Sequence, residues 1–400
     1  MNTTLAQALK GQRLPKLSIS EVKNPVWTGP SREGPQGGVT QSLLSRFLVC
    51  RERFRLLVVE GLKLADSFSH RLEFGSMWHV CEENLAKSPR AINNLLSHIG
   101  VPLTHYCQHL CKRYPTQQGE VDKYYQLCKV MFPLYVEHWS RNKEEKNRTP
   151  LLQEQKFDVP YKLSSGRMVR LRGKFDAADL IGKGRGSGIY LFETKTKGDI
   201  NEQQIVRQLS FDLQTMLYLI ALQSVQHDYV TDTPGDALGE WGNSILGVRY
   251  NVIRRPLSGG KGDVRLRKDE SIASLCERLE EKIREEPGNW FMRWKVEVSQ
   301  ADIDKFRREC LDPILEQLCD WWEWIMLSSR FGPKSSPFDA GPYKVGEPGT
   351  GKAGDGIHWR LPYGIFNPLA EGKSSDLDHH LANGSTVGLQ RTSELFPELA

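Results

Sequence analysis

Two short segments of this chain carry side chains suited to binding a divalent cation. Gly173-Lys174-Phe175-Asp176 ends one apolar run, and Glu193-Thr194-Lys195 ends another, with Glu193 lying 17 residues after Asp176. Carboxylates are hard oxygen ligands of the kind Mg²⁺ prefers, and bound Mg²⁺ acidifies water and neutralises phosphate charge. If the two carboxylates and the ammonium converge, they are suited to activating water against a phosphodiester bond.

The spacing within the second segment assigns a role to each residue. Glu193 and Lys195 are two positions apart, so on a strand their side chains face the same way, and the carbonyl of Thr194 lies between them as a further ligand. The Lys195 ammonium either orients water or steadies charge on the phosphate. Alternatively, Lys195 is neutral through burial and acts as a general base. An Asp followed by Glu-x-Lys is common by chance, and such residues usually lie at solvated strand ends. A carboxylate that ends a buried strand is energetically costly unless it has a binding partner.

The elements around these residues alternate between strand and helix. Alternating apolar residues predict strands at 168–176, 189–193 and 244–253, with a glycine-rich turn at 182–188. Helical spacing predicts a helix over 201–223. The order strand, turn, strand, helix, strand predicts a mixed sheet with the crossover helix on one face.

Helical patterns flank this region on both sides. Leu43, Phe47, Cys50 and Phe54 predict a helix from Ser42, followed by helices at 74–85, 91–99, 101–113 and 121–140 and a charged break at 141–148. Residues 271–286 and 300–326 are also predicted to be helical. Five tryptophans there form either core or stacking platforms for bases: Trp290, Trp294, Trp321, Trp322 and Trp324.

These motifs resemble those of the PD-(D/E)XK nuclease superfamily, specifically its RecB-like exonuclease branch. Four segments occur in the order of that branch: Gly75-Ser76-Met77-Trp78-His79 with Glu82 or Glu83 one turn later, Gly173-Lys174-Phe175-Asp176, Glu193-Thr194-Lys195, and Gln214-Thr215-Met216-Leu217-Tyr218. The resemblance covers about residues 42–255, and the whole chain is similar to phage-type members.

The resemblance implies an α/β fold with a restriction-endonuclease-like core, in which a central mixed β-sheet is flanked by helices, with helical N-terminal and C-terminal additions. We expect a flexible arm at 1–40, a helical segment at 41–150 that contributes His79, the nuclease core at 151–260, a helical Trp-rich segment at 261–330 and an extended tail at 331–400.

The resemblance also implies the roles of individual residues. Asp176, Glu193 and the Thr194 carbonyl would bind the metal, His79 would complete the site, and Lys195 would be catalytic. Gln214 and Tyr218 are one turn apart and share a helix face. The resemblance implies that this pair contacts a DNA phosphate or else the active-site lysine and carboxylates. Gln208 is the alternative to Gln214 if the motif lies in a different register on this helix. Taken alone, His79 would be a packed histidine beside Trp78, Tyr218 ordinary helix packing and Gln214 a surface residue.

We expect Mg²⁺ or Mn²⁺ as the cofactor, with the imidazole favouring Mn²⁺ somewhat. Several relatives carry an iron–sulfur cluster, and the surroundings of Cys50 resemble its first ligand. The eight cysteines of this chain lack the four-ligand spacing, so we predict no cluster, a tail that replaces it as a clasp, and a buried apolar Cys50. Gly349-Thr350-Gly351-Lys352 lacks the spacing of an ATP-binding loop, so we predict no ATP.

A basic segment follows the last predicted strand. It is either a flexible cationic loop that binds the DNA backbone or a solvated loop, and it contains Arg254, Arg255, Lys261, Arg265, Arg267 and Lys268. The net charge of +5 neither demands nor opposes a nucleic-acid partner.

The sequence thus predicts a metal-dependent deoxyribonuclease, with an exonuclease of recombination or repair as the leading interpretation. The alternatives are an endonuclease on the same site and a DNA-binding or assembly protein with a vestigial site. DNA is the expected partner, with a helicase or a single-strand annealing or recombinase protein as a further one. With no apolar run long enough to span a membrane and no secretory signal, a cytoplasmic location is expected.

Overall fold

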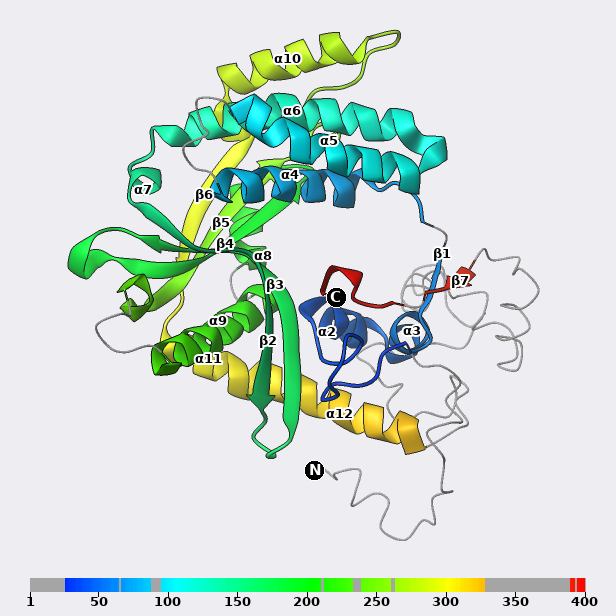
Figure 1. Cartoon of the computed structure of the whole chain (residues 1–400), viewed down its shortest axis with the longest axis vertical. Helices are drawn as coiled ribbons and strands as arrows, with labels where there is room; N and C mark the ends of the chain where they lie inside the picture. Colours follow the sequence, from blue (N-terminus) through cyan, green and yellow to red (C-terminus); the bar gives the residue numbers. More distant parts are fainter. Residues whose placement is uncertain are drawn as a thin grey trace. The chain divides into compact units, whose positions relative to one another are not determined.

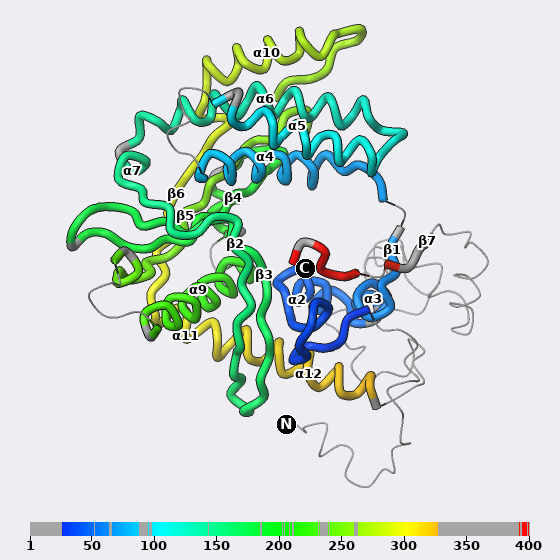
Figure 2. The backbone as a smooth tube through the Cα atoms, in the orientation of Figure 1, coloured from blue at the N-terminus to red at the C-terminus, as the bar shows by residue number. Residues whose placement is uncertain are grey.

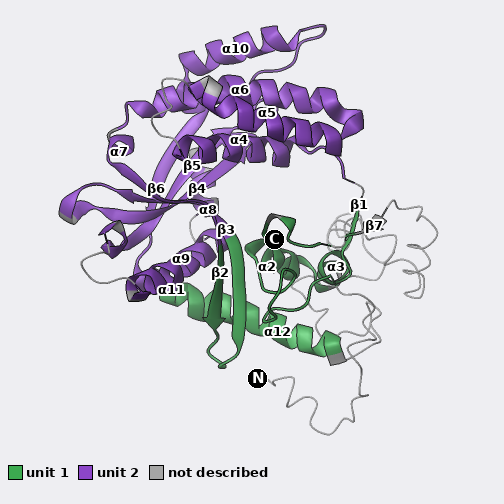
Figure 3. Cartoon of the chain, in the orientation of Figure 1, with its two compact units in different colours: residues 1–65, 157–173, 304–400 green, residues 66–156, 174–303 purple. Residues whose placement is uncertain are grey.

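The computed structural model describes residues 26–64, 66–87, 95–209, 212–232, 239–259, 263–327, 389–392 and 394–399. Most of the predicted arm and tail, the segment 349–352 and Lys261 lie outside the described residues. The chain forms two compact units, drawn in different colours in Figure 3. Unit 1 comprises Met1–Ala65, Phe157–Gly173 and Asp304–Ala400, and unit 2 comprises Asp66–Lys156 and Lys174–Ile303.

A five-stranded mixed sheet forms the framework of the predicted core. Its strands, in spatial order, are β2 (Arg148–Lys162), β3 (Met168–Ile181), β4 (Gly188–Lys197), β5 (Ile245–Arg254) and β6 (Phe291–Glu297). β4 pairs antiparallel with β3 and parallel with β5, and β6 pairs antiparallel with β5. The tube in Figure 2 follows this path from β3 through β4 to the crossover helix and back to β5. The mixed α/β sheet is therefore confirmed.

Two of these strands were not predicted. Buried and exposed residues alternate in β2 only from Phe157 onward, so its first half shows no strand period. β6 buries only its first residue, Phe291, and its partly exposed side chains give no two-residue period. Both strands are held by pairing within the sheet, which a local pattern does not report.

Helices cover both faces of the sheet in unit 2. They are α4 (His70–Lys87), α5 (Leu95–Arg113), α6 (Gln118–Ser140), α7 (Lys143–Lys146), α8 (Glu202–Leu209), α9 (Leu213–Asp232) and α10 (Ile272–Glu285). Figure 1 shows α4, α5, α6 and α10 stacked on one side of the sheet and α9 on the other. The first group shares a core with Ile253 of β5 and Phe291 of β6.

The predicted break between 99 and 101 is wrong, because α5 continues through Pro102. Ile99, Leu103 and Leu110 are buried in the core on one side of this helix. Their packing offsets the hydrogen bond that proline removes.

Unit 1 contains the remaining elements. They are α2 (Gln41–Val49), α3 (Arg51–Phe54) continued by a π-helical turn (Arg55–Val59), β1 (Leu62–Leu64) paired with β7 (Leu389–Arg391), and α12 (Asp312–Leu327) after a second π-helical turn (Arg307–Leu311). The short helix α11 (Gln300–Phe306) has residues in both units. Trp321 packs edge-on against Phe47 and Phe54 and is buried, as is Trp290 of unit 2, so these two tryptophans belong to the core.

The helix predicted from Ser42 to Phe54 is interrupted at Cys50, whose backbone is extended (φ −165°, ψ 122°). Cys50 is half-buried rather than buried, which corrects that prediction. It lies at the junction of two helices, where its Sγ accepts the backbone N–H of Arg53. Among the described residues, no helix has both the length and the hydropathy that crossing a membrane requires.

Candidate active site

The two acidic motifs meet where β3 and β4 run side by side. The backbone N–H of Thr194 donates to Oδ2 of Asp176 at 2.8 Å, so the Asp176 carboxylate lies against the backbone between Glu193 and Lys195. Burial raises the pKa of Asp176, and the charges of His79 and Lys195 oppose that shift. The structure thus brings together the carboxylates and the ammonium that the sequence singled out.

Glu193, Lys195 and Gln214 form a closed triangle of hydrogen bonds. Lys195 Nζ lies 2.5 Å from Oε1 of Glu193 and 2.8 Å from Oε1 of Gln214, and Gln214 Nε2 donates to Oε1 of Glu193 at 2.7 Å. Since β4 supplies the first two residues and α9 the third, the crossover helix closes the site. Burial lowers the pKa of Lys195, but the charges of Glu193 and Asp176 prevail and raise it.

The other oxygen of Glu193 has no partner. The side chain is only 1% exposed, and Oε2 is buried without a hydrogen bond among the described residues. Burial and the neighbouring Asp176 charge raise the pKa of Glu193 to about 7, although Lys195 opposes the shift. A buried carboxylate oxygen without a donor is costly, and a cation is the partner that such an oxygen lacks.

Tyr218 lies one turn beyond Gln214 on α9. Its ring contacts Phe175 edge-on, with 5.9 Å between the ring centres. Burial and the charges of Glu193 and Asp176 raise its pKa, so the hydroxyl keeps its proton and remains a donor. The side chain of Gln208, the alternative to Gln214, lies outside the described residues.

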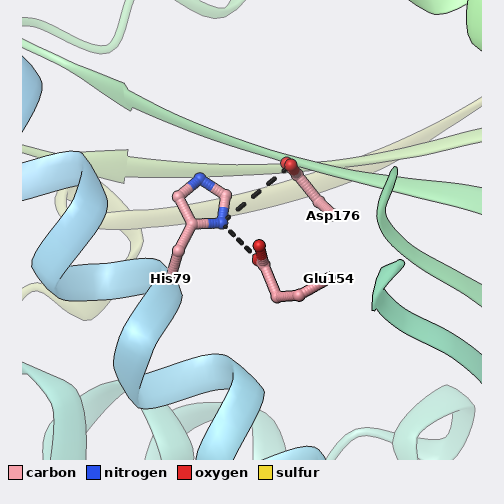
Figure 4. Close-up of side chains that lie close together, drawn as sticks. All are labelled: His79, Glu154 and Asp176. Carbon is pink, nitrogen blue, oxygen red and sulfur yellow. Dashed lines mark hydrogen bonds and ion pairs between the residues drawn. The ribbon is translucent and has the colours of Figure 1, made fainter. Parts of the chain in front are cut away.

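A second cluster of ligand atoms adjoins Asp176 (Figure 4). Nδ1 of His79 lies 2.9 Å from Oε1 of Glu154 and 4.0 Å from Oδ1 of Asp176, and one ligand atom of each residue lies within 4.8 Å of the others. Burial lowers the pKa of His79, but Asp176 and Glu154 outweigh it and raise the pKa to about 10. An imidazole and two carboxylates in this arrangement fit a divalent cation such as Mg²⁺ or Mn²⁺.

Glu154 was missed by the sequence analysis. Its side chain is 5% exposed, and Lys174 Nζ lies 2.5 Å from its second carboxylate oxygen. Its backbone is in the left-handed region, with φ at 48°, which is unusual for a non-glycine residue within a strand. It stands among polar residues of the irregular first half of β2, so the local pattern resembled a solvated segment. Its contact with His79 joins residues 75 positions apart, which a local sequence pattern does not report.

Glu82 holds the opposite face of β4. Its Oε2 accepts from Thr194 Oγ1 at 2.8 Å, and its Oε1 accepts from Tyr135 OH and Asn251 Nδ2, both at 2.9 Å. Glu83, the other residue considered, instead pairs with Lys87 at 2.6 Å. Glu82 is therefore the acid of this helix that accepts a hydrogen bond from the Thr194 side chain.

The basic segment is not one flexible loop, which corrects that expectation. Arg254 belongs to β5, is 3% exposed and lies over the ring of Trp290, while Arg255 is 7% exposed. The backbone N–H of Arg255 donates to the Lys197 carbonyl at 2.7 Å, so the chain continues the sheet hydrogen bonding beyond β5. Three further residues of the segment are exposed: Arg265, Arg267 and Lys268.

Comparison with protein families matches residues 39–320 of this chain to the model of the PD-(D/E)XK nuclease superfamily. The match spans most of the chain and contains every residue described above as part of the site. A search of curated proteins gives no match.

Proposed function

Because this chain belongs to the PD-(D/E)XK nuclease superfamily, whose members are nucleases that use divalent metals, we propose that it hydrolyses DNA phosphodiester bonds with Mg²⁺ or Mn²⁺. The observation that carries the proposal is the hydrogen-bonded triangle of Glu193, Lys195 and Gln214 beside Asp176 and His79. It keeps a protonated lysine at a cluster of acidic ligand atoms, in the interior of unit 2.

The metal would be held by Asp176, Glu193 and His79, with the Thr194 carbonyl as a backbone ligand. The unpartnered Oε2 of Glu193 and the convergence of His79 with Asp176 support this set. To it we add Glu154, which faces the same imidazole. When bound, the cation neutralises phosphate charge and acidifies a water molecule.

Lys195 would act as a donor in this reaction. Its raised pKa and its contacts with two acceptors keep the ammonium charged, so it can orient the attacking water or bind a phosphate oxygen. The same contacts argue against the neutral general base that the sequence left open. Gln214 holds the ammonium in place, and the Tyr218 hydroxyl is a second donor for the phosphate.

The site is tested by Glu193→Ala and Lys195→Ala. Both variants should lose Mg²⁺-dependent cleavage of DNA and keep the wild-type circular dichroism spectrum and melting temperature within a few degrees. Lys183→Ala, in the exposed turn between β3 and β4, is a matched control and should cleave normally. Full activity of either site variant would refute the assigned roles.

Within this activity, we propose an exonuclease of recombination or repair, working with a helicase or with a single-strand annealing or recombinase protein. The resemblance to RecB-like exonucleases supports this narrower reading. Digestion of linear single-stranded, linear double-stranded and closed circular DNA tests it. Cleavage of the closed circle at the rate of the linear duplex would replace the exonuclease with an endonuclease on the same site.

The rival outside this class is a DNA-binding or assembly protein with a vestigial site. The intact acidic pair Asp176 and Glu193, with Lys195 bonded to Glu193, argues against it. Calorimetric titration with Mn²⁺ separates the two, because a vestigial site should give no binding heat that depends on Asp176.

A further inference from the structure

Positive charge gathers where β4 and β5 end, on the sheet face that α4 covers. Ile253 of β5 packs into the core beneath α4 and α6, and Arg255, two residues later, faces the same side. The Arg255 side chain is 7% exposed. Its Nε is buried and has no hydrogen-bond partner among the described residues. Nothing in the proposed reaction uses this guanidinium.

The surroundings of Arg255 contain further positive charge beside groups that oppose it. Burial and the charge of Arg71 lower the pKa of Arg255, although Tyr124 and Asp263 oppose the shift. Burial, Arg255 and Arg71 lower the pKa of His70, and Glu120 opposes that shift. The acid that faces Arg255 is Asp263, and its carboxylate accepts three backbone N–H groups, from Leu257, Gly259 and Val264. A buried cation without a bonded anion is costly, so the site is suited to receive one.

Gly198, directly after β4, leaves room for the Arg255 guanidinium beside the end of that strand. A Cβ on Gly198 would lie 3.4 Å from Nη2 of Arg255 and 3.1 Å from Cβ of Ser258. The glycine therefore lets both side chains approach the strand end. Ser258 Oγ, like Arg255 Nε, has no hydrogen-bond partner among the described residues. A guanidinium fork and a hydroxyl are suited to phosphate oxygens.

The first turn of α4 adds to this field. His70 and Arg71 begin an 18-residue helix whose N-terminus carries partial positive charge, which Glu73 in the same turn offsets in part. His70 stacks on Tyr124, with 5.3 Å between ring centres, which fixes the helix start beside the residues that surround Arg255.

We propose that Arg255, with Ser258 and the first turn of α4, binds a phosphate group of the DNA strand beside the scissile phosphate. The inference rests on the proposed nuclease function. Gly198 lies three residues beyond Lys195, or about 10 Å along the strand. At a rise of about 3.4 Å per nucleotide, that phosphate lies within about three nucleotide steps of the cut.

The test neutralises phosphates of the DNA one at a time. A set of oligonucleotides, each with one methylphosphonate linkage, is bound to the full chain in EDTA, so that no cleavage occurs. We expect one linkage near the cleavage position to weaken wild-type binding about tenfold. Arg255→Gln should bind unmodified DNA about tenfold more weakly and lose its sensitivity at that linkage alone, which is the coupling expected of a direct contact.

Two further variants keep the test independent of folding. Arg255→Lys retains the charge and should keep most of the sensitivity, whereas Lys183→Gln makes the same charge change at the opposite end of β4 and should leave the scan unchanged. If Arg255→Gln weakens DNA binding by the same factor for every modified oligonucleotide, the variant keeps the wild-type sensitivity at the critical linkage, and the proposal is wrong.

The source of the phosphate is tested separately. If inorganic phosphate raises the melting temperature of the wild type but not of Arg255→Gln, and the linkage scan is flat, the site binds free phosphate and the DNA assignment is wrong. Failure of the nuclease function would instead appear as wild-type protein that does not cleave DNA with Mg²⁺ or Mn²⁺.

Discussion

Gln214→Ala gives the sharpest test of how the site positions its lysine. The substitution removes the acceptor that lies 2.8 Å from Lys195 Nζ and the donor that lies 2.7 Å from Glu193 Oε1. Hydrogen bonds to charged groups contribute about 1.5–3 kcal/mol each. A loss of about 3 kcal/mol from the transition state lowers kcat by about 10²-fold.

The substitution removes no proposed metal ligand, and Gln214 bonds Oε1 of Glu193 rather than the unpartnered Oε2. We therefore expect the Mg²⁺ concentration for half-maximal activity to stay within about threefold of wild type while kcat falls. The assay is single-turnover cleavage of end-labelled DNA across a Mg²⁺ series, with melting temperatures recorded for each variant. Gln223→Ala, on the same helix α9 and hydrogen-bonded to Gln300 outside the site, is the matched control and should cleave normally. A Gln214→Ala enzyme with wild-type kcat, or one no slower than the control, would refute the positioning argument.

Three other predictions follow from particular contacts. Glu154→Gln removes one negative charge beside His79, so the Mn²⁺ affinity measured by calorimetry should fall at least about tenfold. Glu83→Gln is the control, and an unchanged affinity of Glu154→Gln would exclude Glu154 from the metal site. Burial raises the pKa of Glu145, but Arg293, Arg148 and Arg249 prevail and lower it to about 2. The carboxylate therefore stabilises the fold above its ordinary pKa near 4.5, and about 3 kcal/mol is lost as pH falls from 6 to 2. Urea unfolding of wild type and Glu145→Gln should differ at pH 6 and converge at low pH; a pH-independent difference contradicts this. Gly247→Ala would place a Cβ 2.1 Å from the Val296 carbonyl oxygen at a φ of 145°, so the free energy of unfolding should fall by at least about 2 kcal/mol. Gly186→Ala meets no atom within 4 Å and should be neutral. Equal melting temperatures of the two variants would show that β5 and β6 can separate at this point without cost.

The central sheet was predictable where buried residues repeat within one segment. The strands that carry Asp176 and Glu193 have such runs, and the helix that carries Gln214 has the helical period, so their order predicted a mixed sheet. β2 and β6 lack these local patterns because they are held by pairing with neighbouring strands. Pro102 and Cys50 show errors of the opposite kind. The local pattern predicted a break before Pro102, where the helix continues, and a continuous helix through Cys50, where the helix is interrupted.

The sequence by itself determined the chemistry that this chain can offer: two carboxylates, an imidazole, a lysine and a glutamine at spacings that match a nuclease family. Where the spacing is local, as between Glu193 and Lys195 or between Gln214 and Tyr218, a strand or helix period converts it directly into a shared face. Only the tertiary structure decided that Glu154 joins His79, that Glu82 rather than Glu83 supports Thr194, and that Arg254 and Arg255 are buried. Each of these depends on a contact between segments far apart in the chain, whose formation is governed by burial and charge pairing rather than by neighbouring residues.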